Sequence, residues 1–232
     1  MPISVFGEGA GMIGGDHKDA GLWAGSPNDS FGSSTELFIR NDGIKIVMSG
    51  RWSIVGHIPA NAIINSAVGC FTKSAGIAAA VLVKELYDCV TAFGVTPTDE
   101  GASASPAAAS QPTHNRAFAN PTNTPWAGGG AVTAADNGIL SDTVNANGND
   151  IIGTVYQYNF KPLVDLWKLN DANNNGYFIR RTDITAYYTR YHSQEAAVPA
   201  NRPYLTIDWD LPPSTTTTHQ SHIAIHNGIA IM

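Results

Sequence analysis

Hydrophobic and polar residues alternate along several short stretches of the chain, and this pattern predicts β-strands. In residues 204–210, for example, Leu205, Ile207 and Trp209 alternate with polar neighbours, as expected for a strand with one buried face. Comparable stretches, separated by turn-forming residues, predict further strands over residues 36–40, 43–48, 54–58, 63–72, 78–89, 153–160, 177–181 and 185–191.

One stretch has helical spacing instead. In residues 161–169, Leu163, Leu166 and Trp167 fall on one face of a helix, and Pro162 stands in its first turn, where proline is favoured. Many short strands, one short helix and no internal repeat together predict an all-β fold. We expect an antiparallel β-sandwich of jelly-roll type over residues 21–211.

Residues 93–150 interrupt this pattern with turn-rich, low-complexity sequence. Residues 101–112 are almost wholly Ala, Ser, Gly and Pro. A stretch of this length without regular structure is usually a functional or wrapping loop. We therefore expect a long loop that wraps the body and is held by buried Trp126 and Phe118.

Both ends of the chain are predicted to be extended arms. Residues 1–20 are rich in glycine, and residues 212–232 begin as a Pro/Thr linker. Beyond the linker, Asn227 and Gly228 separate two alternating apolar segments, which is a strong hairpin signal. An isolated hairpin is marginally stable in water, so we expect it to pair with a sheet edge. The candidate assembly residues on it are Ile223, Ile225, Ile229 and Ile231.

Charge and composition exclude several classes of protein. The formal net charge is −6, and only 14% of residues are charged, which argues against a nucleic-acid partner because such partners need clustered cations. No apolar run reaches the length of about 18 residues that a membrane span needs. Residues 1–15 have neither a basic segment nor a continuous apolar run, so we expect no secretory leader and synthesis in cytoplasm.

The two cysteines do not form a disulfide framework. Cys70 and Cys89 both lie in apolar stretches, and we expect buried free thiols. A disulfide between them remains open for a chain that folds in an oxidising compartment.

The start of the chain contains a motif that resembles a dinucleotide-binding loop. Residues 9–14 match the spacing G-x-G-x-x-G, but a cofactor site also needs a helix that begins at these glycines. Gly15, Gly21, Gly25 and Pro27 follow and would prevent such a helix. We therefore expect a glycine-rich arm and no cofactor.

Two segments have partial metal-binding character. Residues 171–176 match the first half of a calcium loop, but Thr182 occupies the position of the bidentate carboxylate. We expect a turn there, and a structural calcium ion remains open. His219, His222 and His226 cluster near the C-terminus without a carboxylate or cysteine to complete a set, so we expect a polar tail.

Signals for catalysis are weak. No G-x-S-x-G sequence occurs, and the one adjacent acidic pair, Asp99 and Glu100, borders the low-complexity stretch. A glycosidase needs two carboxylates facing each other across a cleft. We expect a protein that is not an enzyme.

Exposed aromatic rings could bind sugars, because flat rings stack on the apolar faces of pyranoses. The candidate glycan contacts are Trp23, Trp126, Tyr187, Tyr188 and Tyr191. Packing in the core or at its rim is the alternative for each of them.

The order of four segments resembles the DNRLRE-type domain, a jelly-roll module similar to carbohydrate-binding modules. The segments are residues 20–40, residues 57–67 (HIPANAIINSA), residues 122–131 (TNTPWAGGGA) and the closing set 173–179, 192–195 and 202–207. The chain departs from the family at Arg51–Ile54, which lacks an acidic residue, and at His114, where tryptophan is frequent. The resemblance implies a β-sandwich of a type found in secreted proteins and in phage virions.

Two functions compete at this stage. The first is a structural virion component, such as a capsid-decorating or fibre protein, that assembles through its terminal arms with capsid proteins or with copies of itself. The second is a carbohydrate-binding module of an extracellular or cell-surface protein. The first function predicts a protein partner or a homo-oligomer, and the second predicts a glycan partner. Neither function involves chemistry on a substrate.

Overall fold

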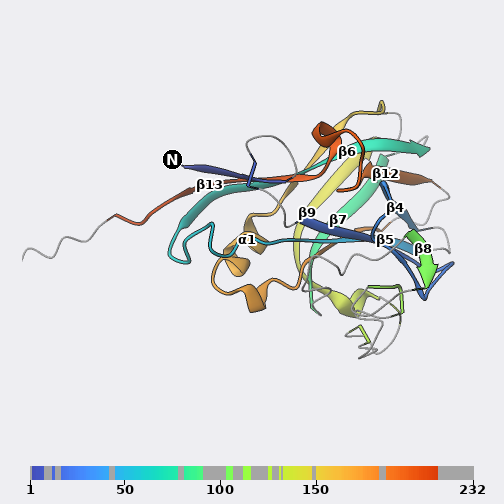
Figure 1. The fold of residues 1–232 in the computed structure, drawn as a ribbon, viewed down its shortest axis with the longest axis horizontal. Coiled ribbons are helices and arrows are strands. Elements are labelled where there is room, and N and C mark those ends of the chain that lie inside the picture. The colour runs from blue at the N-terminus through green and yellow to red at the C-terminus, as the bar shows by residue number, and fades with distance from the viewer. Residues whose placement is uncertain are drawn as a thin grey trace, which may run out of the picture.

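The computed structural model (Figure 1) describes most of the chain. The described residues are 2–7, 12–13, 17–41, 45–77, 81–90, 103–106, 112–115, 125–126, 131, 133–147, 150–182 and 187–213. The glycine motif at 9–14 (apart from Met12 and Ile13), the acidic pair Asp99 and Glu100, Phe118, and the whole segment 214–232 lie outside them. The predictions made for these residues stay predictions.

The described elements are thirteen strands, one α-helix and three short 3-10 helices. The strands are β1 (Ile3–Phe6), β2 (His17–Trp23), β3 (Asp29–Phe31), β4 (Glu36–Asn41), β5 (Lys45–Trp52), β6 (Ile63–Ile77), β7 (Val81–Cys89), β8 (Ser103–Pro106), β9 (Asn137–Asn147), β10 (Val155–Asn159), β11 (Tyr177–Arg181), β12 (Tyr188–His192) and β13 (Tyr204–Asp210). The helices are α1 (Lys161–Trp167), η1 (Ala134–Asp136), η2 (Asp171–Asn173) and η3 (Pro199–Asn201).

Eleven strands form one continuous sheet that curls on itself. Its main path is β1-β13-β6-β12-β4-β5-β11-β7-β9, with β10 paired to β6 and β2 paired to β5, while β3 and β8 form a separate pair. Every pairing between these strands is antiparallel. The predicted all-β, antiparallel sandwich is therefore confirmed.

The long strand β6 belongs to both halves of the curled sheet. Its first part pairs with β13, from Ile63 to Cys70, and its last part pairs with β12, from Lys73 to Ile77. Figure 1 shows β6 passing from the end of the molecule near β13 to the region of β12. Register shifts in both pairings mark irregularities of the bulge type, which strengthen the local bend and twist of a strand.

An aromatic cluster fills the space between the two halves. Trp52 stacks on Tyr177 at 5.0 Å between ring centroids, and Phe160 meets both rings edge-on at 5.0 and 5.1 Å. Phe71 of β6 packs against the same rings. All four side chains are buried, and rings in these geometries attract each other beyond the area that they bury.

The helix α1 closes one end of this core, as the sequence predicts. Leu163, Val164 and Trp167 are buried, and the backbone N–H of Lys161 donates to the Asn159 side chain at the helix start. The helix ends two residues before the predicted boundary at 169. No helix among the described residues has the length and hydropathy needed to cross a bilayer.

The N-terminal segment is not the free arm that the sequence predicts. Residues 3–6 pair with β13 as β1, and residues 17–23 pair with β5 as β2. The buried residues of β2 include His17, Lys18 and Asp19. Because polar side chains occupy these buried positions, the segment shows no hydrophobic periodicity, and the sequence conceals the strand.

Two further expectations are wrong. The stretch 93–150 contains β8, η1 and the eleven-residue strand β9, so it is not a structureless loop throughout. β9 pairs with β7 at the end of the strand path and is mostly polar. Its sequence therefore shows no hydrophobic periodicity.

The strand predicted over residues 54–58 is the second wrong expectation. These residues form turns with a single bridge between Val55 and Ile58, and Gly56 has a φ of 84°.

Other local predictions are confirmed. Trp126 is buried as predicted, packs on Phe178 at 5.3 Å and donates its indole N–H to the Thr113 carbonyl at 2.9 Å. Cys70 and Cys89 are buried free thiols.

The segment that resembles half a calcium loop consists of the short 3-10 helix η2 followed by a turn at Asn174. The Asn174 amide donates to the Trp52 carbonyl at 2.6 Å, and its oxygen accepts the Gly176 N–H. Gly176 has a φ of 89°, a left-handed conformation that glycine adopts easily. The described residues contain no cluster of three or more His, Cys, Asp or Glu side chains suited to a metal ion.

Gly69 offers a test of the core packing. A Cβ at this position would lie 2.3 Å from an edge atom of the buried Phe160 ring, and the surrounding rings leave that ring no room to retreat. We expect Gly69→Ala to lower the free energy of unfolding by about 1–3 kcal/mol, measured by urea denaturation. Gly21→Ala is the control, since its Cβ would meet Phe31 at an ordinary 3.5 Å. Equal midpoints for the two variants would contradict this packing.

Candidate functional site

The outward faces of β4 and β12 bring aromatic and charged side chains together. On β4, Leu37 and Ile39 are buried, so the intervening Phe38 faces away from the core. On β12, Tyr188 and Arg190 alternate with buried neighbours in the same way. The register places Arg190 opposite Phe38. Cross-strand neighbours on one face interact directly, and these two form a continuous surface.

This surface is the floor of a hollow of about 220 Å³ that we call the aromatic groove. β2 and β3 contribute Trp23 and Phe31, whose rings lie 5.6 Å apart at a tilted angle. The residues that line the aromatic groove are Gly21, Trp23, Phe31, Ser34, Glu36, Phe38, Arg40, Tyr188 and Arg190.

The floor of the aromatic groove is fixed by charge as well as by packing. The Arg190 guanidinium lies 3.9 Å from the centre of the Phe38 ring and 5.1 Å from that of Tyr188, which is within the range of cation–π attraction. Its Nη1 also pairs with the Glu36 carboxylate at 2.9 Å. These contacts hold the side chains in one arrangement before any ligand arrives.

A tight turn orients Trp23 at the wall. The N–H of Ser26 donates to the Trp23 carbonyl at 3.2 Å, and Gly25 lies against the edge of the indole. A Cβ on Gly25 would approach the indole nitrogen to 2.7 Å. The absence of a side chain at this position therefore allows the ring to take its place in the wall.

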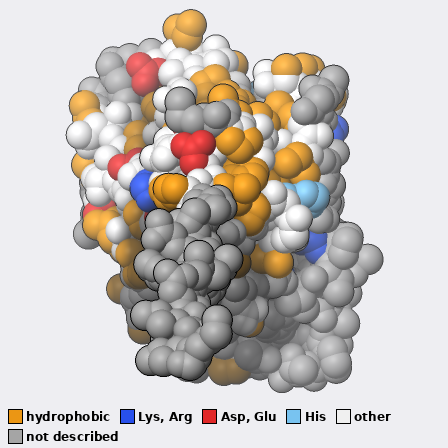
Figure 2. All heavy atoms as spheres, turned by 90° about the vertical axis from the view of Figure 1, so that its left-hand side faces the viewer, with side chains coloured by type: hydrophobic (Ala, Val, Ile, Leu, Met, Phe, Trp, Pro, Cys, Tyr) orange, Lys and Arg blue, Asp and Glu red, His pale blue; other side chains and the backbone are white. Residues whose placement is uncertain are grey.

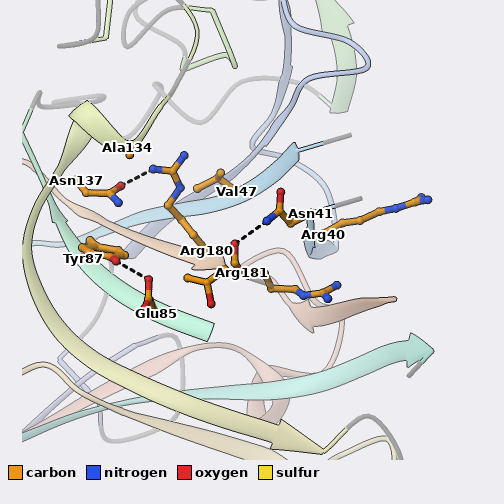
Figure 3. Close-up of a pocket in the computed structure, with 10 residues that line it drawn as sticks. Arg40, Asn41, Val47, Glu85, Tyr87, Ala134, Asn137, Arg180 and Arg181 are labelled. Atoms are coloured by element: carbon orange, nitrogen blue, oxygen red, sulfur yellow. Dashed lines mark hydrogen bonds between the residues drawn. The ribbon is translucent and has the colours of Figure 1, made fainter. Parts of the chain in front are cut away.

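A second hollow, of about 230 Å³, borders the aromatic groove and shares Arg40 with it. We call it the polar hollow (Figure 3). Its lining residues are Arg40, Asn41, Val47, Glu85, Tyr87, Ala134, Asn137, Arg180, Arg181 and Thr182.

Hydrogen bonds order the polar hollow. Nη1 of Arg180 donates to the Thr133 carbonyl at 2.6 Å and to the side-chain oxygen of Asn137. The Tyr87 hydroxyl donates to Glu85. In Figure 3 the side chain of Arg180 turns toward Asn137, while that of Arg40 extends to the opposite side.

The electrostatics of the polar hollow follow from burial. Burial lowers the pKa of Arg180, and the charge of the nearby Asp136 opposes that shift. Burial and the hydrogen bond to Glu85 raise the pKa of Tyr87 to about 12. Near neutral pH, Arg180 is therefore a cation, and Tyr87 is a protonated donor.

The structure brings two of the five predicted glycan contacts together. Trp23 and Tyr188 line the aromatic groove, and Tyr187 is half-buried outside its lining. Tyr191 and Trp126 are buried, with exposed fractions of 0% and 1%, so the prediction is wrong for them because neither ring offers a face to a ligand. The four isoleucines of the predicted assembly arm lie outside the described residues.

Sequence reasoning missed several residues of the aromatic groove. The alternation in residues 36–40 is a usable signal, since Leu37 and Ile39 on the inner face imply an outward Phe38. Nothing in the sequence indicates that Phe31 and Arg190 lie beside it, because both contacts join segments that are distant in the chain.

A second polar cluster, around His17, lies deep in the core. His17 stacks on Trp52 at 4.3 Å, its Nε2 lies 2.9 Å from the Tyr177 hydroxyl, and its Nδ1 lies 3.5 Å from Asp19. Burial lowers the pKa of His17 to about 3. Since both His17 and Asp19 are buried, this cluster has a role in stability rather than in ligand binding.

No protein-family model matches the chain, and no curated protein matches its sequence. The resemblance to DNRLRE-type domains therefore stays a prediction, and the function has to be argued from the geometry of the chain itself.

The burial of His17 makes a prediction about pH. Between pH 6.5 and pH 3 the unfolded chain binds a proton at His17 that the folded chain excludes, so the free energy of unfolding falls as the pH falls. The slope is up to about 1.4 kcal/mol per pH unit. Asp88 acts oppositely, because burial raises its pKa to about 6, and the folded chain then binds the extra proton between pH 6 and pH 3.8.

Asp88 contributes equally to the stability of the native chain and of the His17→Gln variant. The difference between their free energies of unfolding therefore reports on His17 alone. We expect the variant to lose less stability than the native chain between pH 6.5 and pH 4.5, measured by urea denaturation at each pH. Parallel pH dependences for the two chains would contradict a neutral, buried His17.

Proposed function

We propose that the chain is a non-catalytic recognition module that binds carbohydrate in the aromatic groove. The observation that carries this proposal is the set of Trp23, Phe38 and Tyr188 around one open hollow, with Arg190 and Glu36 between them. The rings supply flat apolar surface for a sugar ring. Guanidinium and carboxylate groups supply the planar, paired hydrogen bonds that suit neighbouring hydroxyls.

The size of the aromatic groove favours a chain-like ligand over a compact one. Its volume of about 220 Å³ lies below the range of about 300–1,000 Å³ typical of clefts that enclose drug-sized ligands. A hollow of this size accommodates part of a polysaccharide while the rest of the polymer extends beyond it.

The distribution of carboxylates supports binding without hydrolysis. Among the residues that the structure describes, Glu36 is the one carboxylate in the lining of the aromatic groove, and Arg190 holds it in an ion pair. Glycoside hydrolysis ordinarily needs two carboxyl groups on opposite sides of the scissile bond. A lining whose carboxylate is already paired supports a binding role in this proposal.

Neighbouring tyrosines provide a matched test. We expect Tyr188→Ala to weaken glycan binding by about 1–3 kcal/mol, the range observed when rings that stack on flat ligands are removed. Tyr187→Ala should bind as the native chain does, because its ring does not line the aromatic groove. Affinity electrophoresis in a panel of polysaccharides, followed by calorimetry on those that bind, measures both. If no polysaccharide binds the native chain at millimolar concentration, the proposal fails.

A second candidate, a structural component that assembles with copies of itself or with capsid proteins, is favoured by the opposite end of the molecule. Ile3, Ile63 and Leu211 are 65%, 50% and 59% exposed, and the pairing of β1 and β6 with β13 places them close together. Figure 2 faces this end and shows hydrophobic side chains gathered on it. Exposed apolar surface of this kind is typical of interaction sites. The two candidates are compatible, since a virion protein could use the aromatic groove for adhesion.

Truncation tests the assembly candidate. β13 ends at Asp210, so removal of residues 212–232 leaves its pairing intact. We expect the shortened chain to keep the unfolding temperature of the full chain but to be smaller by light scattering, because it lacks the predicted hairpin arm. An unchanged particle size would contradict a role of this segment in assembly.

A further inference from the structure

The strand β1 is the first strand of the sheet path, and half of its outer edge has no partner among the described residues. On the inner edge, Trp209 donates its N–H to the Pro2 carbonyl at 3.2 Å. Every second residue makes such bonds in an antiparallel pair, so the backbone groups of Ile3 and Val5 point away from β13. The Val5 carbonyl accepts the N–H of Ile13 at 2.6 Å. The N–H and C=O of Ile3 have no such partner within the described part of the chain, and this edge can accept a further strand.

The side chains beside this edge are apolar and exposed. Ile3 and Ile63 flank the last residues of β13 from opposite sides, at Asp208 and Asp210, and Leu211 follows directly. An apolar edge strand readily pairs with another chain, and proteins usually cover such an edge or place charges on it. A strand added beside β1 would bring its own side chains next to Ile3 and shield it from water.

The chain leaves the body beside this same edge. β13 ends at Asp210, next to the start of β1, and residues 211–213 are exposed. Pro212 and Pro213 favour extended backbone both at their own positions and at the residue before each of them. In Figure 1 the segment that follows β13 accordingly leads away from the body. This direction favours contact with a neighbouring molecule over an immediate return to the sheet.

The sequence after Pro213 has the composition that such an edge requires. Residues 222–231 contain the two alternating apolar segments with the four isoleucines of the predicted assembly arm. No acidic side chain follows Pro213, so Asp208 and Asp210 would not repel the segment. Residues 214–221 connect it to the body, and eight extended residues span at most about 26–29 Å. This reach is sufficient for the edge of an adjacent copy.

We infer that residues 222–231 of one copy pair with the outer edge of β1 in a second copy and cover the exposed Ile3. This inference rests on the assembly candidate described above, and it adds the donor segment, the acceptor edge and the partner, which is a second copy of this chain. Each copy has one donor segment and one acceptor edge. Two copies can therefore exchange segments, and exchange of identical elements is a low-cost route to a dimer.

Two variants separate the donor from the acceptor. Removal of residues 212–232 deletes the donor segment and keeps β1, whereas Ile3→Lys keeps the segment and places a charge on the edge, where lysine opposes strand addition. We expect the full native chain to sediment as an assembly of at least two copies and each variant alone to sediment as a single chain. Ile3→Pro removes the outward N–H of the edge and should behave as Ile3→Lys does. Thermal unfolding checks that each variant is folded.

Mixing the two variants tests the pairing directly. The shortened chain supplies an intact edge, and Ile3→Lys supplies an intact donor segment. We expect the mixture to form a one-to-one pair in analytical ultracentrifugation, although neither variant associates alone. Ile151→Lys is the control, because Ile151 is an exposed isoleucine before β10 and is separated from β1 by β13 and β6. This control should assemble as the native chain does.

The outcomes that overturn the inference are distinguishable from failure of the assembly candidate. Native-sized assemblies of folded Ile3→Lys and Ile3→Pro would refute the edge as acceptor and leave the assembly candidate standing. If the mixed variants do not associate, pairing of the segment with β1 is refuted in the same way. A native chain that stays single at every concentration, or that assembles equally well without residues 212–232, would refute both.

Discussion

The pairing of β6 with both halves of the curled sheet is the constraint on which the rest of the structure depends. Side chains alternate between the two faces of a strand, so the register of one pairing decides which residues of the neighbouring strand point inward. Tyr191 lies opposite Lys73 of β6 and faces the core, and Tyr188 and Arg190 therefore face outward. The same register that closes the core thus builds the floor of the aromatic groove.

Polar groups inside the core hold this arrangement together. The Lys84 ammonium lies 2.8 Å from the Tyr191 hydroxyl and 4.4 Å from the centre of the Tyr156 ring. The Tyr191 hydroxyl lies 2.8 Å from the Tyr158 hydroxyl. These contacts join β7, β10 and β12 beneath the site. Because a buried polar group is costly without partners, an alternative pairing that separated them would be disfavoured. Tyr191 therefore supports the groove from below rather than touching a ligand.

The sequence predicts those parts of the fold in which hydrophobic periodicity and burial coincide. Strands such as β11 and β13 and the helix α1 were recognisable for this reason, and Trp126 was recognisable as an isolated large residue in a polar loop. β2 was not, since its buried residues include His17 and Asp19, whose hydrogen-bond partners Tyr177 and Gln194 lie far away in the chain. β9 was hidden by its polar composition at the end of the strand path.

The candidate site shows the same division. Trp23 and Tyr188 could be proposed as ligand contacts because flat rings stack on sugars, but Tyr191 met the same criterion and is buried. Side chains alternate between the two faces of a strand, so Tyr188 and Tyr191, which are three positions apart, face opposite ways. Only the pairing with β6 decides which of them faces inward. The arginines were not predicted at all, because Arg40, Arg180 and Arg190 come from three strands that meet only in the folded chain.

The central claim is that glycans bind where Trp23 and Tyr188 meet, and the five tryptophans of the chain allow a direct measurement. The indole N–H signals of the ¹⁵N-labelled chain can be followed by NMR during titration with a polysaccharide, with Trp23→Phe to assign the signal of Trp23. The account predicts that the Trp23 signal moves while those of the buried Trp52, Trp126 and Trp167 stay in place. Movement of the Trp209 signal beside β1, with that of Trp23 unchanged, would contradict it.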